Sequence, residues 1–303
     1  MPSCQGSVPS SPGSLSFLSM VRSWDVAADL PPIDVRPLLP GERAKLLELL
    51  AGLENSDWTR ATVCPGWNVH DVALHLLGND IGRLGPPVQP EARSGKLDFG
   101  SLAGWIEQSN EDWVRAARRI PPSLLVEFLA LGGPRVDAAF ARLDMGAEGV
   151  AVAWTGTGPS PYWLDVAREY TERWVHHQQI RQALGRPALL GRRWLHPVLA
   201  TFMRALPLAY ESVPAAAGTR VAVVVDGPAG GRWLIRRDDE RWSLIADDGR
   251  PAATEVRMGV SIVWRLWTRL ATVDEAQAYI AIAGDENLGV PAARVVAVMT
   301  TKP

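Results

Sequence analysis

Residues 161–184, PYWLDVAREYTERWVHHQQIRQAL, decide how the helical N-terminal part of the chain folds. The segment predicts one long helix, and Gly185-Arg186-Pro187 predicts where that helix ends. Within it, Glu172 and His176 lie four residues apart. A helix therefore places a carboxylate and an imidazole one turn apart on the same face, which is half of a metal site.

The predicted helix has two different faces. At about 100° per residue, Asp165, Glu172 and His176 point to one side. The opposite side is an apolar stripe formed by Trp163, Ala167, Tyr170, Trp174 and His177. Two interpretations follow. Either the polar side faces water and the Glu/His contact is worth a few tenths of a kcal/mol, or the helix is buried on both sides around a polar pocket.

His75 is the candidate for the other half of the metal site. It flanks an apolar stripe whose members repeat at helical spacing, namely Val69, Val72, Ala73, Leu76 and Leu77. A single histidine in such a position is more often a core residue than a ligand. Two histidines and one carboxylate, however, suit Zn²⁺ or another divalent transition metal and leave one coordination position open for chemistry.

The rest of the first half also has helical periodicity. A first helix begins near Pro40, and Asn55-Ser56-Asp57 predicts a turn at its end. Further helices are predicted at about 102–120 and 124–145, and one more, at about 194–212, begins the second part of the chain. We interpret residues 35–190 as a helical, metal-binding domain, and residues 1–34, which are rich in Ser, Pro and Gly, as a disordered tail.

The periodicity changes after residue 220. Strands are predicted at 221–226, 232–237, 241–246 and 255–258, and the glycines of residues 227–231 indicate a hairpin turn rather than a phosphate-binding loop. A Trp-rich helix at 259–269, a short segment at 279–283 and a last helix to residue 299 follow. Strands followed by helices indicate an α+β domain over residues 191–303 rather than a parallel sheet.

The charge composition indicates which kinds of molecule the protein is expected to bind. A net charge of −2 and a pI near 6.2 provide no basic surface, which argues against nucleic acid and against an anionic membrane. We expect a small-molecule substrate and a monomer or homodimer. Two cysteines are too few for a disulfide framework, so we expect a cytoplasmic protein. Cys64 is interpreted as a small buried residue, with a nucleophile as the alternative.

Three groups of residues together resemble a known family. They are Cys64-Pro65-Gly66-Trp67 through His75-Leu76, the Glu172-x-x-x-His176 helix, and the later pairs Asp226-Gly227, Arg241-Trp242, Gly249-Arg250 and Gly284-Asp285. Over roughly residues 35–300 the chain resembles the mycothiol-dependent maleylpyruvate isomerase family of DinB-like metalloproteins. The resemblance implies a DinB-like four-helix bundle followed by a small sterol-carrier-like α+β domain. It also implies that His75, Glu172 and His176 are metal ligands.

The resemblance implies a metal-dependent enzyme, with Zn²⁺ as the first choice of metal and mycothiol as thiol cofactor or co-substrate. Addition of the thiol to a small electrophilic substrate gives isomerisation if the addition reverses after bond rotation, and S-transfer if a leaving group departs. Two alternatives stay open. One is a DinB-like metalloenzyme that acts without a thiol in a specialised biosynthetic pathway, and the other is a non-enzymatic ligand-binding protein.

Residues near the metal differ from the family's pattern. The family often has Asp three residues after its second ligand histidine, where this chain has Gln179, and His177 stands beside the ligand, so we expect a different outer contact. The resemblance further implies that Arg269, at the end of the predicted helix 259–269, holds an anionic substrate in an active site between the domains. The alternative is a solvated charge at a helix C-terminus.

Overall fold

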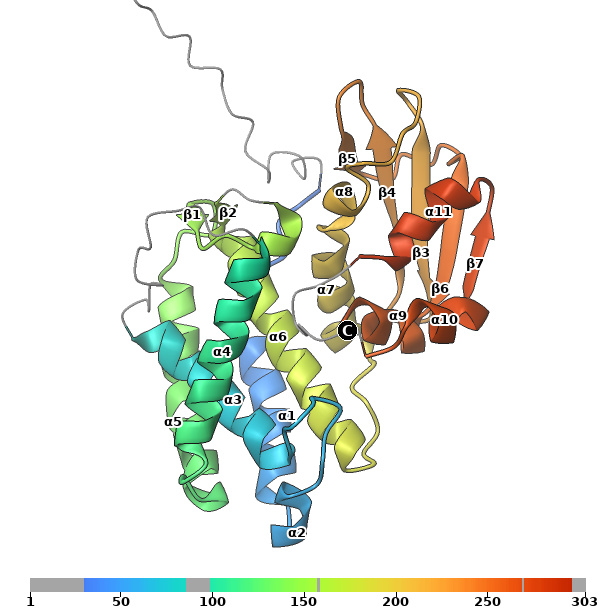
Figure 1. Cartoon of the computed structure of the whole chain (residues 1–303). Helices are drawn as coiled ribbons and strands as arrows, with labels where there is room; N and C mark the ends of the chain where they lie inside the picture. Colours follow the sequence, from blue (N-terminus) through green and yellow to red (C-terminus); the bar gives the residue numbers. More distant parts are fainter. Residues whose placement is uncertain (1–29, 86–98, 157–158, 269, 296–303) are drawn as a thin grey trace, which may run out of the picture.

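The computed structural model describes residues 30–85, 99–156, 159–268 and 270–295 of the 303-residue chain. A helical region lies beside a region built on a five-stranded sheet, and helix α7 (Arg192–Met203) stands between them (Figure 1). The predicted order, a helical part followed by a part with mixed secondary structure, is confirmed. Most of the predicted tail, residues 1–29, lies outside the described residues.

The long helices of the first region match the predicted ones. They are α1 (Leu39–Ala51), α3 (Val69–Leu84), α4 (Phe99–Ala117), α5 (Pro122–Ala141) and α6 (Tyr162–Ala183). A short helix, α2 (Asn55–Trp58), stands where a turn was predicted. The prediction missed it because Glu54 and Asp57 form a reciprocal capping box, which completes a helical turn out of residues typical of turns. Strands β1 (Glu148–Gly149) and β2 (Ser160–Pro161) and the 3₁₀ turn η2 (Ala153–Thr155) lead into α6.

The loop before α3 fixes where that helix begins. Gly66 has a φ of 79°, a conformation that favours glycine. Asn68 then caps the helix, because its side chain accepts a hydrogen bond from the Asp71 N–H and the Asp71 carboxylate accepts one from the Asn68 N–H. His75 follows within two turns of this fixed start.

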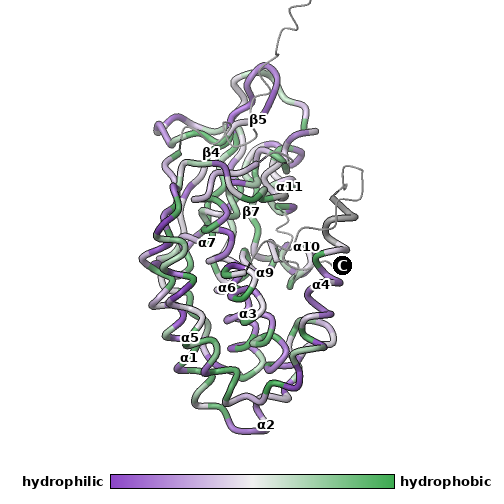
Figure 2. The backbone as a smooth tube through the Cα atoms, turned by 90° about the vertical axis from the view of Figure 1, so that its left-hand side faces the viewer, coloured by the Kyte–Doolittle hydropathy of each residue, from purple (hydrophilic) through white to green (hydrophobic). Residues whose placement is uncertain are grey.

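Helix α6 is buried on both sides. Tyr170 and Trp174 pack into the main hydrophobic core, and Asp165, Glu169 and His176 on the polar side are buried as well. Hydrophilic and hydrophobic residues alternate along the helices of this region (Figure 2). The polar side of α6 therefore does not face water. The second interpretation is correct: the helix is buried on both sides, with polar residues in the interior.

Two helices replace the single one predicted at 194–212. Helix α7 ends at Met203, and the short helix α8 (Leu206–Ala209) follows. Pro207 explains the break. Its ring would clash with the carbonyl of Met203 in a continuous helix, whereas proline is tolerated in the first turn of a new one.

The sheet of the second region is mixed, with strand order β5-β4-β3-β6-β7. Its strands are β3 (Arg220–Asp226), β4 (Gly231–Arg237), β5 (Trp242–Ile245), β6 (Thr254–Gly259) and β7 (Ile280–Ala283). Neighbouring strands are antiparallel except β3 and β6, which are parallel. The predicted hairpin joins β3 to β4. The short segment predicted at 279–283 is the edge strand β7.

Helices cover one face of this sheet. They include α9 (Val260–Trp267), α10 (Val273–Ala276) with the 3₁₀ turn η3 (Gln277–Tyr279), and α11 (Glu286–Ala293). The last described helix ends earlier than the predicted residue 299, and residues 296–303 lie outside the described ranges. None of the helices in those ranges has the length and hydrophobicity that a bilayer crossing requires.

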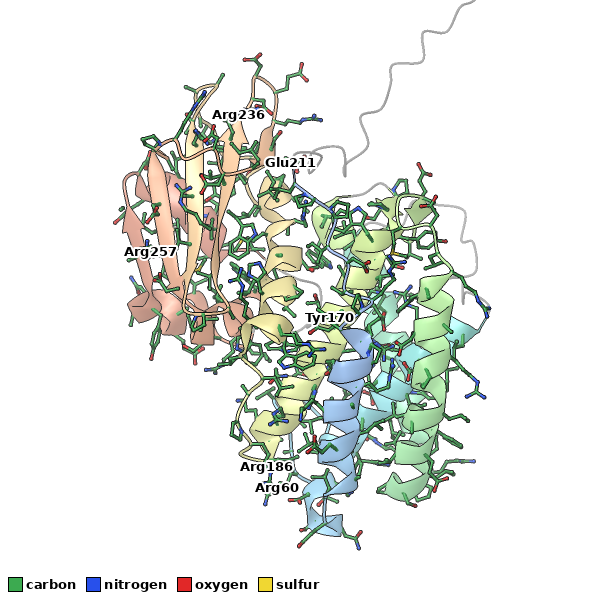
Figure 3. All side chains as sticks on the ribbon, turned by 180° about the vertical axis from the view of Figure 1, so that it is seen from behind. Arg60, Tyr170, Arg186, Glu211, Arg236 and Arg257 are labelled. Atoms are coloured by element: carbon green, nitrogen blue, oxygen red, sulfur yellow. The ribbon has the colours of Figure 1, made fainter. Side chains whose placement is uncertain are left out.

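The two regions share one hydrophobic core. Trp174 of α6 meets Trp264 of α9 edge to face, with ring centroids 5.3 Å apart. Tyr170 of α6, labelled in Figure 3, donates its hydroxyl to the Trp194 carbonyl in α7 at 3.0 Å. The predicted boundary at residue 190 therefore falls inside a continuous core, and a division into two domains stays a prediction.

Candidate metal centre

Three side chains meet between helices α3 and α6. His75 comes from α3, Glu172 and His176 come from α6, and their ligand atoms all lie within 4.8 Å of one another. The Nε2 atoms of His75 and His176 lie 3.1 and 2.9 Å from the same oxygen, Oε1 of Glu172. The two imidazole rings meet edge to face, with centroids 4.6 Å apart. The structure thus brings together the three residues that the resemblance assigns to the metal.

Burial and the shared carboxylate determine the charges of these groups. Burial lowers the pKa of His75. Burial also lowers the pKa of His176, but the negative charge of Glu172 and hydrogen bonding with Cys64 and Glu172 outweigh it and raise that pKa to about 10. Burial alone would raise the pKa of Glu172. His176 and His75 outweigh burial and hold this pKa well below its usual range. The Glu172 carboxylate therefore favours the charged form of His176, whereas burial favours the neutral form of His75.

The donor set fits a divalent transition metal. Tetrahedral ligands about 2.0–2.2 Å from Zn²⁺ lie roughly 3.4 Å from each other, so the three ligand atoms need only small movements to surround an ion. A fourth position then remains for a small ligand. The Glu172 side chain is 13% exposed, whereas those of His75 and His176 are 4% and 5% exposed, so the carboxylate is the most accessible of the three groups.

Other side chains hold His75 in place. The Trp67 ring covers His75, with centroids 5.2 Å apart, and its indole N–H donates to Glu111 at 2.8 Å. Asn79 places its Nδ2 atom 3.4 Å from His75 Nε2, the same atom that contacts Glu172, so the amide lies beside the ligand atoms. Asn79 was not predicted as a site residue, although it lies one helical turn after His75. The His75-x-x-x-Asn79 spacing is the signal that could have identified it.

Gln179 and Cys64 lie behind His176. Gln179 Oε1 is 2.6 Å from His176 Nδ1, and the Cys64 thiol donates to the same oxygen at 3.1 Å. Cys64 also lines a pocket of about 320 Å³ together with Trp67 and Asp71. Because the thiol is buried and engaged as a donor, its placement favours the interpretation of Cys64 as a small buried residue.

His177 does not point into the site. Its Nδ1 atom lies 2.7 Å from Oε1 of Glu42 on α1, and both side chains are buried. Consecutive residues of a helix point about 100° apart, so only one of the two adjacent histidines can face His75. The different outer contact expected from the sequence is therefore made by Gln179.

A buried charge network extends from the site along α3 and α6. Arg83 makes two hydrogen bonds of 2.7 Å to Asp165 and an ion pair of 3.0 Å with Glu169. Arg173 pairs with Asp80 at 2.6 Å and with Glu169 at 3.0 Å. Burial raises the pKa of Glu169, but the surrounding arginines, Arg83 first, bring it down to about 2. These pairs hold the two helices that carry the ligands at a fixed separation.

Arg269, the predicted substrate-binding residue, lies outside the described residues. The preceding helix, α9, contacts α6 through Trp264 and Trp174. Since Trp174 is two residues from both Glu172 and His176, this contact is on the side of α6 away from the ligands. A role of Arg269 and an active site between the two regions therefore stay predictions.

Comparisons with known proteins found one similar family and two similar structures. Residues 39–181 match the family described as the mycothiol maleylpyruvate isomerase N-terminal domain. The matched range covers most of the helical region of the chain. The match includes His75, Glu172 and His176, and the resemblance inferred from the sequence is confirmed.

Two solved structures are similar to most of the chain. One is a crystal structure of the mycothiol-dependent maleylpyruvate isomerase, with 14% sequence identity and a TM-score of 0.50. The other is that protein with one histidine replaced by alanine, with 15% identity and a TM-score of 0.51. Each comparison covers 84% of this chain and 94% of the other chain. At this identity the likeness shows a shared fold. No curated protein sequence matches the chain.

Proposed function

We propose that this protein is a divalent-metal enzyme that uses mycothiol as cofactor or co-substrate in isomerisation or S-transfer on a small electrophilic substrate. The observation that carries the proposal is the convergence of His75, Glu172 and His176 within a region that matches the mycothiol maleylpyruvate isomerase N-terminal domain. We further propose that residues 35–190 form a DinB-like four-helix bundle and residues 191–303 a sterol-carrier-like domain.

His75, Glu172 and His176 would hold the metal, with Zn²⁺ as the first choice. When bound, such an ion supplies Lewis acidity and favours the ionised form of a thiol. The buried side chains around it prepare the site. Trp67 shields His75 from water, and Asn79 presents an amide donor beside the ligand atoms. Glu172 is the most accessible of the three groups, so a small ligand would reach the metal from its side.

Mycothiol would supply the nucleophilic thiol of the reaction. The protein's own Cys64 is poorly placed for that task, because it is buried behind His176 and its thiol donates to Gln179. The arrangement therefore supports chemistry that depends on an external thiol rather than on a protein cysteine.

Binding of mycothiol tests this function. With Zn²⁺ present, mycothiol at about a hundredfold excess over its dissociation constant should stabilise the native state by about 2.7 kcal/mol, measured as a rise in melting temperature. The His176→Ala variant and an unrelated thiol, β-mercaptoethanol, serve as controls and should give smaller shifts. A metal-loaded protein that does not respond to millimolar mycothiol would favour the thiol-independent metalloenzyme, and a protein that binds no metal would favour the ligand-binding protein.

We also propose that Arg269 binds an anionic group of the substrate. Arginine suits this role because its planar guanidinium forms two parallel hydrogen bonds to a carboxylate. Arg269→Lys should retain the fold and the metal but lose turnover, since lysine offers a point charge in place of the bidentate donor. Turnover equal to that of the unchanged protein would remove Arg269 from the active site.

A further inference from the structure

The contact behind His176 involves an amide whose orientation is determined by its neighbours. Gln179 is fully buried, one turn after His176 on α6. Its Oε1 atom lies 2.6 Å from His176 Nδ1 and 3.1 Å from the Cys64 sulfur. Its Nε2 atom has no hydrogen-bond partner among the described residues. Both polar contacts of this side chain are therefore made by one oxygen.

The chemistry of the two neighbours explains this arrangement. A histidine that binds a metal through Nε2 carries its proton on Nδ1, so Nδ1 becomes a donor that needs an acceptor. The Cys64 thiol is also a donor. If the amide were reversed, its NH₂ group would face two donors and neither hydrogen bond could form. His176 and Cys64 together therefore select the orientation that presents the oxygen.

We propose that Gln179 is a positioning residue that fixes His176 with Nδ1 protonated and Nε2 directed at the metal, and that the Cys64 thiol fixes the Gln179 amide. This inference rests on the proposed metal site. It assigns Cys64 a role in the outer shell of the site, separate from catalysis. The oxygen of Gln179 is neutral, so it orients the imidazole without the increase in ligand basicity that a carboxylate partner gives.

Matched variants of each residue separate this role from simple packing. Gln179→Met keeps the approximate volume and removes the acceptor, whereas Gln179→Glu keeps an acceptor and adds charge. Cys64→Ser keeps a donor, and Cys64→Ala removes it. The Zn²⁺ dissociation constant is measured by competition with a chelator, and the protonated nitrogen of His176 in the Zn²⁺-loaded protein is identified by ¹⁵N NMR.

We expect Gln179→Met to weaken Zn²⁺ binding about tenfold to a hundredfold and Gln179→Glu to bind at least as tightly as the unchanged protein. Cys64→Ser should bind like the unchanged protein, and Cys64→Ala should bind more weakly than Cys64→Ser. The inference is overturned if Gln179→Met keeps the original affinity and the Nδ1–H signal. If Gln179→Met does not fold, equal affinities of the two Cys64 variants overturn it.

The same measurements distinguish this inference from the proposed metal site. His176→Ala removes a ligand and should cost most of the Zn²⁺ affinity. If His176→Ala binds Zn²⁺ like the unchanged protein, the metal site itself is wrong. If His176→Ala loses Zn²⁺ but Gln179→Met does not, the metal site stands and the positioning role of Gln179 fails.

Discussion

At the scale of single residues, two adjacent histidines of α6 have separate surroundings. His176 faces His75 and Glu172, whereas His177 is enclosed in the core and contacts Glu42 of α1. The Nε2 atom of His177 is buried without a hydrogen-bond partner in the described part of the chain. The contact between Nδ1 and Glu42 is therefore the polar interaction that compensates for burying this ring.

Glu42→Leu tests this division of roles. The substitution should lower the free energy of unfolding by about 1–3 kcal/mol, because it leaves a buried imidazole nitrogen unsatisfied. Metal content should not change, since the His177 ring points away from the site. Urea denaturation and metal analysis measure the two quantities. Glu48→Leu, at an exposed position of the same helix, is the control and should change stability by less than about 0.5 kcal/mol. Loss of metal in Glu42→Leu would place His177 in the site.

At the scale of elements, ion pairs between α3 and α6 stabilise the pair of helices that carries the ligands. Glu169 accepts from Arg83 of α3 and from Arg173 of α6 in the protein interior. A pKa lowered from the usual 4.5 to about 2 corresponds to roughly 3 kcal/mol of stability. Because the folded-state pKa is the lower one, this contribution is fully present above about pH 4.5 and is lost as the pH falls toward 2.

A Glu169→Gln variant isolates this contribution. At pH 7 it should be less stable than the unchanged protein by roughly 3 kcal/mol. The difference should shrink below about pH 4.5 and disappear near pH 2, because glutamate is then protonated and resembles glutamine. Denaturation curves of both proteins at a series of pH values measure this difference in the free energy of unfolding. A difference that stays constant from pH 7 to pH 3 would show that packing, not charge, accounts for the effect.

Local sequence patterns predicted most of the helices and strands, but not which of them contact each other. Periodicity located α6 and the strands, and the order of the two regions was correct. The polar face of α6 could not be assigned, because polar residues at helical spacing suit water and an interior charge network equally well. That network joins positions far apart in the chain, such as Arg83 and Asp165 or Glu42 and His177, and local spacing carries no information on such pairs.

At the site, too, local spacing predicted only the pairs of residues that are close in sequence. The spacing of Glu172 and His176 follows from the helical repeat, so the sequence could place them on one face. His75 is 97 residues from Glu172, and the family resemblance rather than spacing joined them. Cys64 and Gln179 are 115 residues apart, and no local signal predicted their contact.

At the scale of the whole molecule, the shared core predicts that the two regions unfold together. Trp264→Ala removes a buried ring that packs on Trp174, and should cost about 3–5 kcal/mol. Hydrogen exchange should then become faster in α6 as well as in α9. Leu208→Ala, at a position that is 41% exposed, is the control and should change little. Faster exchange confined to the sheet region would contradict a common core and support independent domains.

We expect His75, Glu172 and His176 to bind one divalent metal per chain. The four histidines to compare are two in the site and two that contact backbone carbonyls elsewhere. His70 Nε2 lies 2.9 Å from the Ile120 oxygen, and His196 Nδ1 lies 3.1 Å from the Ala229 oxygen.

The most direct measurement is the metal content of purified protein and of the four alanine variants by mass spectrometry. We predict about one metal ion per chain in the unchanged protein, in His70→Ala and in His196→Ala, and loss of most of that metal in His75→Ala and His176→Ala, because each removes one of three ligands. Equal metal content in all four variants, or none in the unchanged protein supplied with Zn²⁺, would contradict this expectation.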